Sequence, residues 1–181
     1  MGVSYGIYDP PYNRGAVCVG ISHDTPAFAA HSIATWWQRE GSRRYPRAPK
    51  LLVLADCGGS NSCTSWAWKT EVQDQVCNTC GLAVTIAHYP TGASKWNPIE
   101  HRLFSEISKN WAGEPLDSHE KMLKFIRTTH TQTGLVVTAY LDPKQYPTGL
   151  KPDPQLIASL RLTPDPLLPH WNYTIAPNLR S

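Results

Sequence analysis

Two carboxylates, Asp56 and Glu100, stand where their side chains could do chemistry. Asp56 ends the apolar run at residues 51–55 and is followed by a turn that contains Gly58 and Gly59. Glu100 stands at the start of an expected helix, beside three cationic or titratable side chains: Lys95, His101 and Arg102. Carboxylate oxygens bind divalent metal ions, and neighbouring cations can face phosphates. The pair is therefore a candidate divalent-metal site for phosphodiester chemistry.

Both carboxylates also have an ordinary structural explanation. Ligands gather at the carboxyl ends of strands in open α/β sheets, but an aspartate there can equally cap the next helix or solvate a turn. Asn97 as N-cap, Pro98 at the first helical position and Glu100 at the third would form a start like a capping box. Spacing alone does not separate the two explanations for either residue.

Other side chains offer weaker candidates, each with a plain alternative. Cys77 and Cys80 form a C-x-x-C pair that could complete a zinc site with Cys57 and Cys63, or serve as small buried residues. His23, Asp24 and His88 lie near expected strand ends, where they could line a cleft or belong to turns and core. Trp96 could stack on a frayed base or cover a helix start. A basic cluster could contact phosphate or form a solvated loop: Arg43, Arg44 and Arg47.

The elements that must position these residues follow from periodicity and turn chemistry. Pro26 after Thr25 is typical of a capped helix start, and Gly81 is suited to a helix end. The run at 51–55 lacks polar alternation and predicts a strand covered on both faces. We expect strands at 5–8, 16–21, 51–55, 82–87 and 135–141, and helices from 26, at 65–80, at 98–111 and at 118–129. This order predicts an α/β fold with a mixed sheet flanked by helices.

Composition bounds the class of protein. The 181 residues are 41% hydrophobic and 17% charged, which excludes a disordered or coiled-coil chain. The net charge of +3 permits a nucleic-acid partner without requiring one. No membrane span or signal pattern is visible and the five cysteines do not suggest a secreted disulfide scaffold, so we expect a cytoplasmic protein.

The proline distribution suggests a boundary near residue 142. Eight of the 16 prolines fall in the last 40 residues. We therefore expect a core at 1–141 and a Pro-rich C-terminal extension at 142–181, with at most one short helix near 155–160.

Two long motifs resemble one family of bacterial insertion-sequence transposases. They are LLVLADCGGSN at 51–61 and HYPTGASKWNPIEHRLF at 88–104, and they look like the DDE domain of the Rhodopirellula-type transposases. Shorter matches at 6–9, 23–25, 146–149 and 171–173 extend the resemblance over nearly the whole chain. The resemblance implies a ribonuclease-H-like fold, DNA at transposon ends as partner, and strand cleavage and transfer that depend on Mg²⁺, with Mn²⁺ as a substitute.

The same resemblance assigns roles to residues. Three carboxylates would hold two Mg²⁺ ions, with Asp56 as the second carboxylate and Glu100 as the third. In the family the first Asp lies on a strand before the one that resembles residues 5–8. We expect this chain to lack that strand, to be truncated at its N-terminus and to be catalytically incomplete, with Asp9 as a weak substitute ligand.

The segment around Glu100 would also supply the DNA contacts: Lys95, Trp96, Asn97, His101 and Arg102. A homo-oligomer or another transposase chain could complete the centre. The alternatives are a non-catalytic DNA-binding or multimerising remnant, and a zinc-stabilised module.

Overall fold

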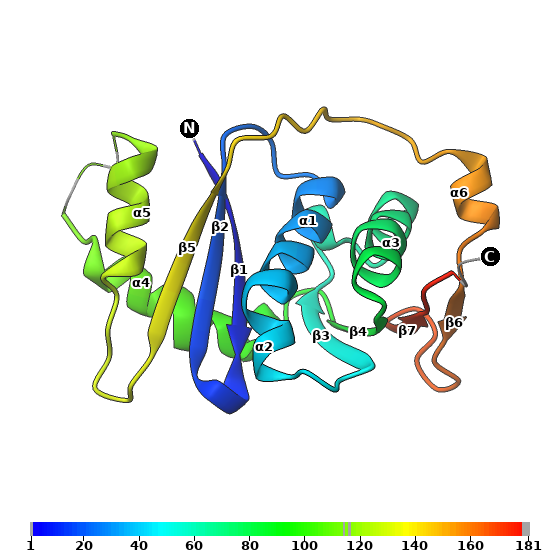
Figure 1. Ribbon diagram of the computed structural model, residues 1–181, viewed down its shortest axis with the longest axis horizontal. Helices are drawn as coiled ribbons and strands as arrows, with labels where there is room; N and C mark the ends of the chain where they lie inside the picture. Colours follow the sequence, from blue (N-terminus) through cyan, green and yellow to red (C-terminus); the bar gives the residue numbers. More distant parts are fainter. Residues whose placement is uncertain (1, 114, 116, 179–181) are drawn as a thin grey trace. The chain divides into compact units, whose positions relative to one another are not determined.

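The structure is a computed structural model that describes residues 2–113, 115 and 117–178. It is an α/β protein with two mixed sheets flanked by helices (Figure 1). The chain divides into two compact units: unit 1 comprises Met1–Asp24 with Lys95–Tyr146, and unit 2 comprises Thr25–Ser94 with Pro147–Ser181. Among the described residues, no helix is long and apolar enough to cross a membrane.

Unit 1 is built on a three-stranded sheet in the order β1-β2-β5. Strands β1 (Val3–Asp9) and β2 (Arg14–Gly20) form the predicted antiparallel hairpin around the 3₁₀ turn η1 (Pro10–Tyr12). Strand β5 (Val136–Asp142) lies parallel to β2, as a strand that returns through a helical crossover does. The hairpin and the strand near 135–141 are therefore confirmed.

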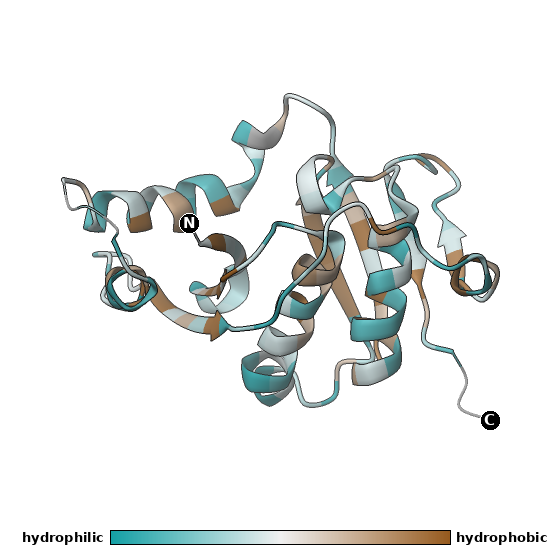
Figure 2. Ribbon diagram, turned by 90° about the horizontal axis from the view of Figure 1, so that it is seen from above, coloured by the Kyte–Doolittle hydropathy of each residue, from teal (hydrophilic) through white to brown (hydrophobic). Residues whose placement is uncertain are grey.

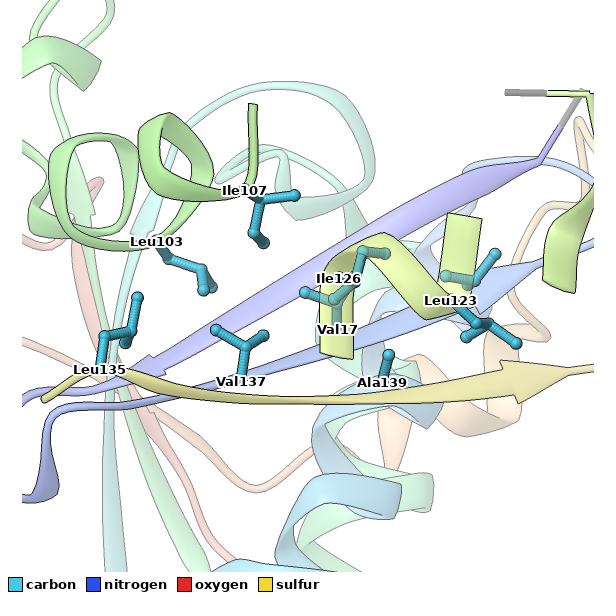
Figure 3. Close-up of a cluster of buried hydrophobic side chains, with 9 residues drawn as sticks. Val17, Leu103, Ile107, Leu123, Ile126, Leu135, Val137 and Ala139 are labelled. Carbon is cyan, nitrogen blue, oxygen red and sulfur yellow. The ribbon is translucent and has the colours of Figure 1, made fainter. Parts of the chain in front are cut away.

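Helices cover one face of this sheet and make the core of unit 1. They are η6 (Glu100–Phe104), which continues into α4 (Ser105–Asn110), and α5 (His119–Arg127). Figure 3 shows their apolar side chains pointing toward those of β2 and β5. The buried cluster consists of Val17, Val19, Leu103, Ile107, Leu123, Ile126, Leu135, Val137 and Ala139. Ser118 caps α5 by accepting a hydrogen bond from the Lys121 amide, as predicted.

Two glycines let the helix that carries Glu100 approach the hairpin closely. A Cβ atom on Gly15 would lie 2.3 Å from Leu103 Cδ1, and one on Gly6 would lie 2.4 Å from Phe104 Cζ. Carbon atoms pack at about 3.5–4.0 Å, so any larger residue at either position would collide with η6. Glycine at 6 and 15 thus fixes how near Glu100's helix sits to its own sheet.

Unit 2 has a four-stranded sheet in the order β3-β4-β7-β6. Strands β3 (Lys50–Asp56) and β4 (Ala83–Tyr89) are parallel, and β7 (Asn172–Ile175) is antiparallel both to β4 and to β6 (Leu162–Pro164). The helices are α1 (Pro26–Trp36), η2 (Trp37–Gly41), α2 (Ser42–Arg44), α3 (Trp66–Glu71) and η4 (Val72–Asn78). Figure 2 shows hydrophobic and hydrophilic residues mixed along the helical ribbons. In α1 most residues are buried, Phe28, Ala30 and Ile33 among them, so this helix is enclosed by the rest of unit 2.

The predicted helix boundaries of unit 2 are confirmed by their caps. The Thr25 hydroxyl accepts a hydrogen bond from the Phe28 amide at the start of α1. The Ser65 hydroxyl accepts one from the Trp68 amide at the start of α3. Gly81 adopts a left-handed φ of 69° where the helical segment that includes η4 ends.

Two expectations differ from the structure. The stretch after residue 142 is not only an extended tail with a short helix: besides α6 (Pro154–Ala158) it supplies β6 and β7 to the sheet of unit 2, so the division at 142 does not coincide with the two units. Residues 179–181 lie outside the described residues. Strand β3 is also not covered on both faces, since Leu52 and Leu54 are 62% and 49% exposed. Leu52 and Leu54 lie on the same face of β3, and a uniformly apolar run does not reveal that one face of a strand is left uncovered.

Candidate functional site

Asp56 is the last residue of β3, at the carboxyl end of the parallel pair β3–β4 and opposite Tyr89. Its side chain is exposed, and the Asn61 amide donates a long hydrogen bond of 3.4 Å to its Oδ1. The loop that returns Asn61 to Asp56 is closed by a disulfide between Cys57 and Cys63. Because one carboxylate oxygen makes only this neutral contact, its remaining lone pairs are available to a cation.

The buried side chain of His88 makes a hydrogen bond to the backbone of Asp56. His88 Nδ1 lies 2.9 Å from the Asp56 carbonyl oxygen, and His88 Nε2 lies 2.8 Å from the hydroxyl of Tyr173. The indole N–H of Trp68 donates to the same hydroxyl at 3.0 Å. Burial lowers the pKa of His88 and the hydrogen bond to Asp56 raises it, while burial raises the pKa of Tyr173. The sequence singled out His88 but missed Trp68 and Tyr173, which meet it only through the pairing of β4 with β7.

A lysine stands beside this buried group. The Lys69 ammonium lies 5.1 Å from the ring centroid of Tyr173 and 5.0 Å from that of the exposed Trp66. Burial lowers the pKa of Lys69, and its charge also lowers the pKa of His88. The sequence gave no signal for Lys69, because its partners come from two separate elements.

Glu100 opens the helical segment η6, and the structure resolves its two alternative explanations in part. The side chain of Asn97 caps the helix by accepting from the Ile99 amide at 3.3 Å, and the Glu100 amide donates to the Asn97 carbonyl at 3.1 Å. Among the described residues, the Glu100 carboxylate takes part in no hydrogen bond or ion pair, and it is exposed. The helix therefore has its cap without using this carboxylate, which leaves both oxygens available.

The other predicted DNA contacts surround Glu100 in unit 1. Lys95 and Trp96 lie on the 3₁₀ turn η5 (Ser94–Trp96), with the ammonium 5.4 Å from the indole centroid and Trp96 71% exposed. The His101 ring hydrogen-bonds the Lys95 carbonyl, and Arg102 is exposed on η6. Asn97 differs from the rest, because its side chain is buried and engaged in the cap.

Asp9, the substitute ligand expected from the sequence, points away from Glu100's helix. Successive side chains of a strand face opposite sides of the sheet, and Gly6 and Tyr8 face the side where Phe104 and its helix pack. Asp9 therefore faces the other side, and it is only 5% exposed. Within unit 1 this placement argues against Asp9 and Glu100 sharing one metal ion.

Each unit thus carries one exposed candidate ligand, Asp56 in unit 2 and Glu100 in unit 1. Within either unit, the residues described contain no group of three or more His, Cys, Asp or Glu side chains arranged to hold a metal ion.

The cysteines do not assemble as the zinc alternative requires. Cys57 and Cys63 are bonded to each other. Cys77 is fully buried, its thiol donates to the Ile175 carbonyl at 3.4 Å, and burial raises its pKa to about 12. A protonated, buried thiol is a packing residue and a poor metal ligand.

The remaining candidates lie on surfaces. His23 and Asp24 are exposed at the end of the first segment of unit 1. Arg44 pairs with Glu40, whereas Arg43 and Arg47 are exposed. Arg43 and Arg44 lie on the short helix α2 and not in the loop expected from the sequence, and phosphate contact by this cluster stays a prediction.

Comparison with known proteins gives one match. A family model described as the Rhodopirellula transposase DDE domain matches residues 2–177. Neither the curated proteins nor the solved structures contain a significant match to the chain.

Proposed function

Because the chain belongs to the Rhodopirellula transposase DDE-domain family, we propose that it acts as a transposase catalytic domain, with Asp56 and Glu100 as divalent-metal ligands for cleaving and joining DNA strands at transposon ends. Family membership supports a transposase-type function in general. The residues named in this proposal go further, and their support is the exposure and the contacts of Asp56 within unit 2 and of Glu100 within unit 1.

The observation that carries the proposal is that both carboxylates are exposed and keep oxygen lone pairs that the described residues do not use. Asp56 is exposed at the carboxyl end of β3, where ligands of open α/β sheets gather, and its backbone is anchored by the buried His88. Glu100 is exposed at a helix start whose capping is done by Asn97. A carboxylate that merely capped or braced the fold would be engaged by the protein, and neither of these is fully engaged.

The donor set fits Mg²⁺, which prefers hard oxygen ligands and keeps part of its water shell. Held by Asp56 and Glu100, such ions would polarise the scissile phosphate and lower the pKa of the attacking water or hydroxyl. The chain's own side chains bind and orient the DNA. Lys95 and Arg102 offer positive charge to backbone phosphates, and Trp96 offers an exposed ring on which an unpaired base can stack.

The proposal assigns two of the three carboxylates of the family pattern, Asp56 and Glu100. Two carboxylates with charge −2 in total hold a divalent ion less tightly than three. We therefore expect Asp56 and Glu100 by themselves to bind metal weakly and to support little DNA cleavage, and a third carboxylate to strengthen both.

A second function is favoured by the exposed Lys95–Trp96 turn and the net positive charge. The chain could bind DNA without cutting it. Such binding would weaken steeply with salt, because counterions are released from the phosphates, and it would be indifferent to sequence. It would also survive Asp56→Asn, which removes a ligand but leaves the cations in place.

The test is Mn²⁺ binding, measured by the loss of the free-ion electron paramagnetic resonance signal, together with cleavage of transposon-end DNA. Asp56→Asn and Glu100→Gln should each abolish Mn²⁺ binding, while the control Asp9→Asn should leave it unchanged. Binding that persists in both ligand variants would refute the site. Strong metal-dependent cleavage that is lost in Asp9→Asn would make Asp9 the third ligand.

A further inference from the structure

Three large side chains from different elements of unit 2 form a hydrogen-bonded series that ends at the Asp56 backbone. Trp68 on α3, His88 on β4 and Tyr173 on β7 are 0%, 6% and 2% exposed (Figure 1 labels the three elements). They are linked in series by the hydrogen bonds from Trp68 to Tyr173, from Tyr173 to His88, and from His88 to the Asp56 carbonyl. The series joins residues 105 positions apart in the sequence and ends on the backbone of the candidate ligand.

The direction of the series follows from what each group can donate. An indole N–H is a donor only and a carbonyl oxygen is an acceptor only, so Trp68 donates to the Tyr173 oxygen and His88 Nδ1 donates to the Asp56 carbonyl. In a neutral ring Nε2 then accepts the proton of the Tyr173 hydroxyl. The ring's single proton therefore lies on Nδ1. Every polar atom in the series has a partner, and only the neutral Nδ1–H tautomer satisfies all of them.

We propose that His88 and Tyr173 are positioning residues that hold the Asp56 carboxylate in one orientation for metal binding. This role rests on the proposed function of Asp56 as a metal ligand, and it adds the residues that orient the Asp56 carboxylate. The β3–β4 ladder fixes the backbone up to Asp56, and the hydrogen bond to its carbonyl fixes the peptide that follows. Only the side-chain torsions then remain free, and the Asn61 amide restrains them. Preorganisation of this kind reduces the entropy lost when the ion binds.

The competing explanation is that the series only ties β7 to the rest of unit 2. Gln73 provides a matched control, because it is also buried, at 4% exposed, and also ties the C-terminal segment to the rest of unit 2. Its Nε2 donates to the Ala176 carbonyl at 2.6 Å, and its Oε1 accepts from the Arg161 amide at 2.7 Å. Gln73 has no hydrogen bond to Asp56 or to His88. Replacing Gln73 should weaken the attachment of the C-terminal segment to unit 2 and leave Asp56 unaffected.

The experiment uses the full 181-residue chain and compares His88→Leu, His88→Asn, Tyr173→Phe and Gln73→Leu. His88→Leu should weaken Mn²⁺ binding by about tenfold or more, as loss of a group that orients a ligand does. His88→Asn should restore most of the affinity, because its amide N–H can take the place of Nδ1–H. Tyr173→Phe removes a single oxygen and serves if His88→Leu does not fold. Gln73→Leu should lower the unfolding midpoint and leave Mn²⁺ affinity within about twofold of the wild type.

Nitrogen NMR of the His88 ring gives a readout that does not depend on metal. The wild type should show the Nδ1–H tautomer, and Tyr173→Phe should shift it toward a mixture. The Asp56 carbonyl carbon should shift in His88→Leu and not in Gln73→Leu. An Nε2–H tautomer, or an effect of His88→Leu on Mn²⁺ no larger than that of Gln73→Leu, would overturn the positioning role. If the wild type bound no Mn²⁺, the proposed function would fail, and the NMR results alone would decide whether His88 orients Asp56.

Discussion

Alanine at position 15 should displace the helix that carries Glu100. The added Cβ would lie 2.3 Å from Leu103 Cδ1 and 3.3 Å from Cδ2, whereas carbon atoms pack at about 3.5–4.0 Å. Leu103 is fully buried in the cluster that includes Ile107 and Val137, so we expect its Cδ1 to move by the ångström or more that is needed only if its neighbours move too. Overpacking of this size destabilises a core by about 1–3 kcal/mol.

The assay for Gly15→Ala is the free energy of unfolding of unit 1. Urea denaturation followed by hydrogen exchange of the β1–β2 amides reports that unit, because the hairpin belongs to it. Gly58→Ala, in unit 2, is the control for adding a methyl group outside unit 1, since nothing lies within 4 Å of a Cβ there and its φ of −135° suits any residue. The control should stay within about 0.5 kcal/mol of the wild type.

A double-mutant cycle tests the cause of the Gly15→Ala effect. Leu103→Ala alone should cost about 2–5 kcal/mol through the cavity it leaves. In the double variant the new methyl group occupies part of that cavity, so the loss should be smaller than the sum by about 0.5–3 kcal/mol. Additive losses, or a Gly15→Ala protein as stable as the control, would refute the close approach of η6 to the hairpin.

Three further outcomes are expected. At about pH 8 the Cys77 thiol, with a pKa of about 12, should resist alkylation by iodoacetamide until the chain unfolds. The half-buried Cys80 should react sooner, and equal alkylation rates for the two thiols would contradict the burial of Cys77. Reducing the Cys57–Cys63 bond should lower the free energy of unfolding by about 2 kcal/mol, as closing so short a loop implies, and a Cys57→Ser protein should no longer respond to reductant. Trp96→Ala should weaken single-stranded DNA binding by roughly fivefold to a hundredfold, the value of one stacked base, whereas Trp66→Ala, another exposed indole, should not.

Local chemistry decided much of the fold in advance. Thr25, Ser65 and Ser118 cap their helices as their side chains predict, because a hydroxyl at that position satisfies an amide that the helix leaves unpaired. The hairpin of β1 and β2 follows from the turn between two apolar strands. Such features depend on a few neighbouring residues, so the sequence alone can predict them. The long motifs around Asp56 and Glu100 likewise identified the family that the chain matches.

The placement of the site residues depended on contacts that no local pattern shows. Strand β7 is four residues long and lies among prolines, yet its pairing with β4 brings Tyr173 to His88. The helix that carries Glu100 covers the side of the β1–β2 hairpin that Gly6 and Gly15 face, and Asp9 faces the opposite side. The sequence does not show which side a helix covers.

Sequence by itself therefore determined the family, the helix caps and the two carboxylates, since residue type and near neighbours are enough for these. Tertiary structure decided that Asn97 caps the helix without the Glu100 carboxylate, that β3 is an edge strand with exposed leucines, and that a buried histidine anchors Asp56. The physical reason is that burial and hydrogen-bond partnership are properties of pairs of segments. A chain specifies them only once strands far apart in sequence have been brought side by side.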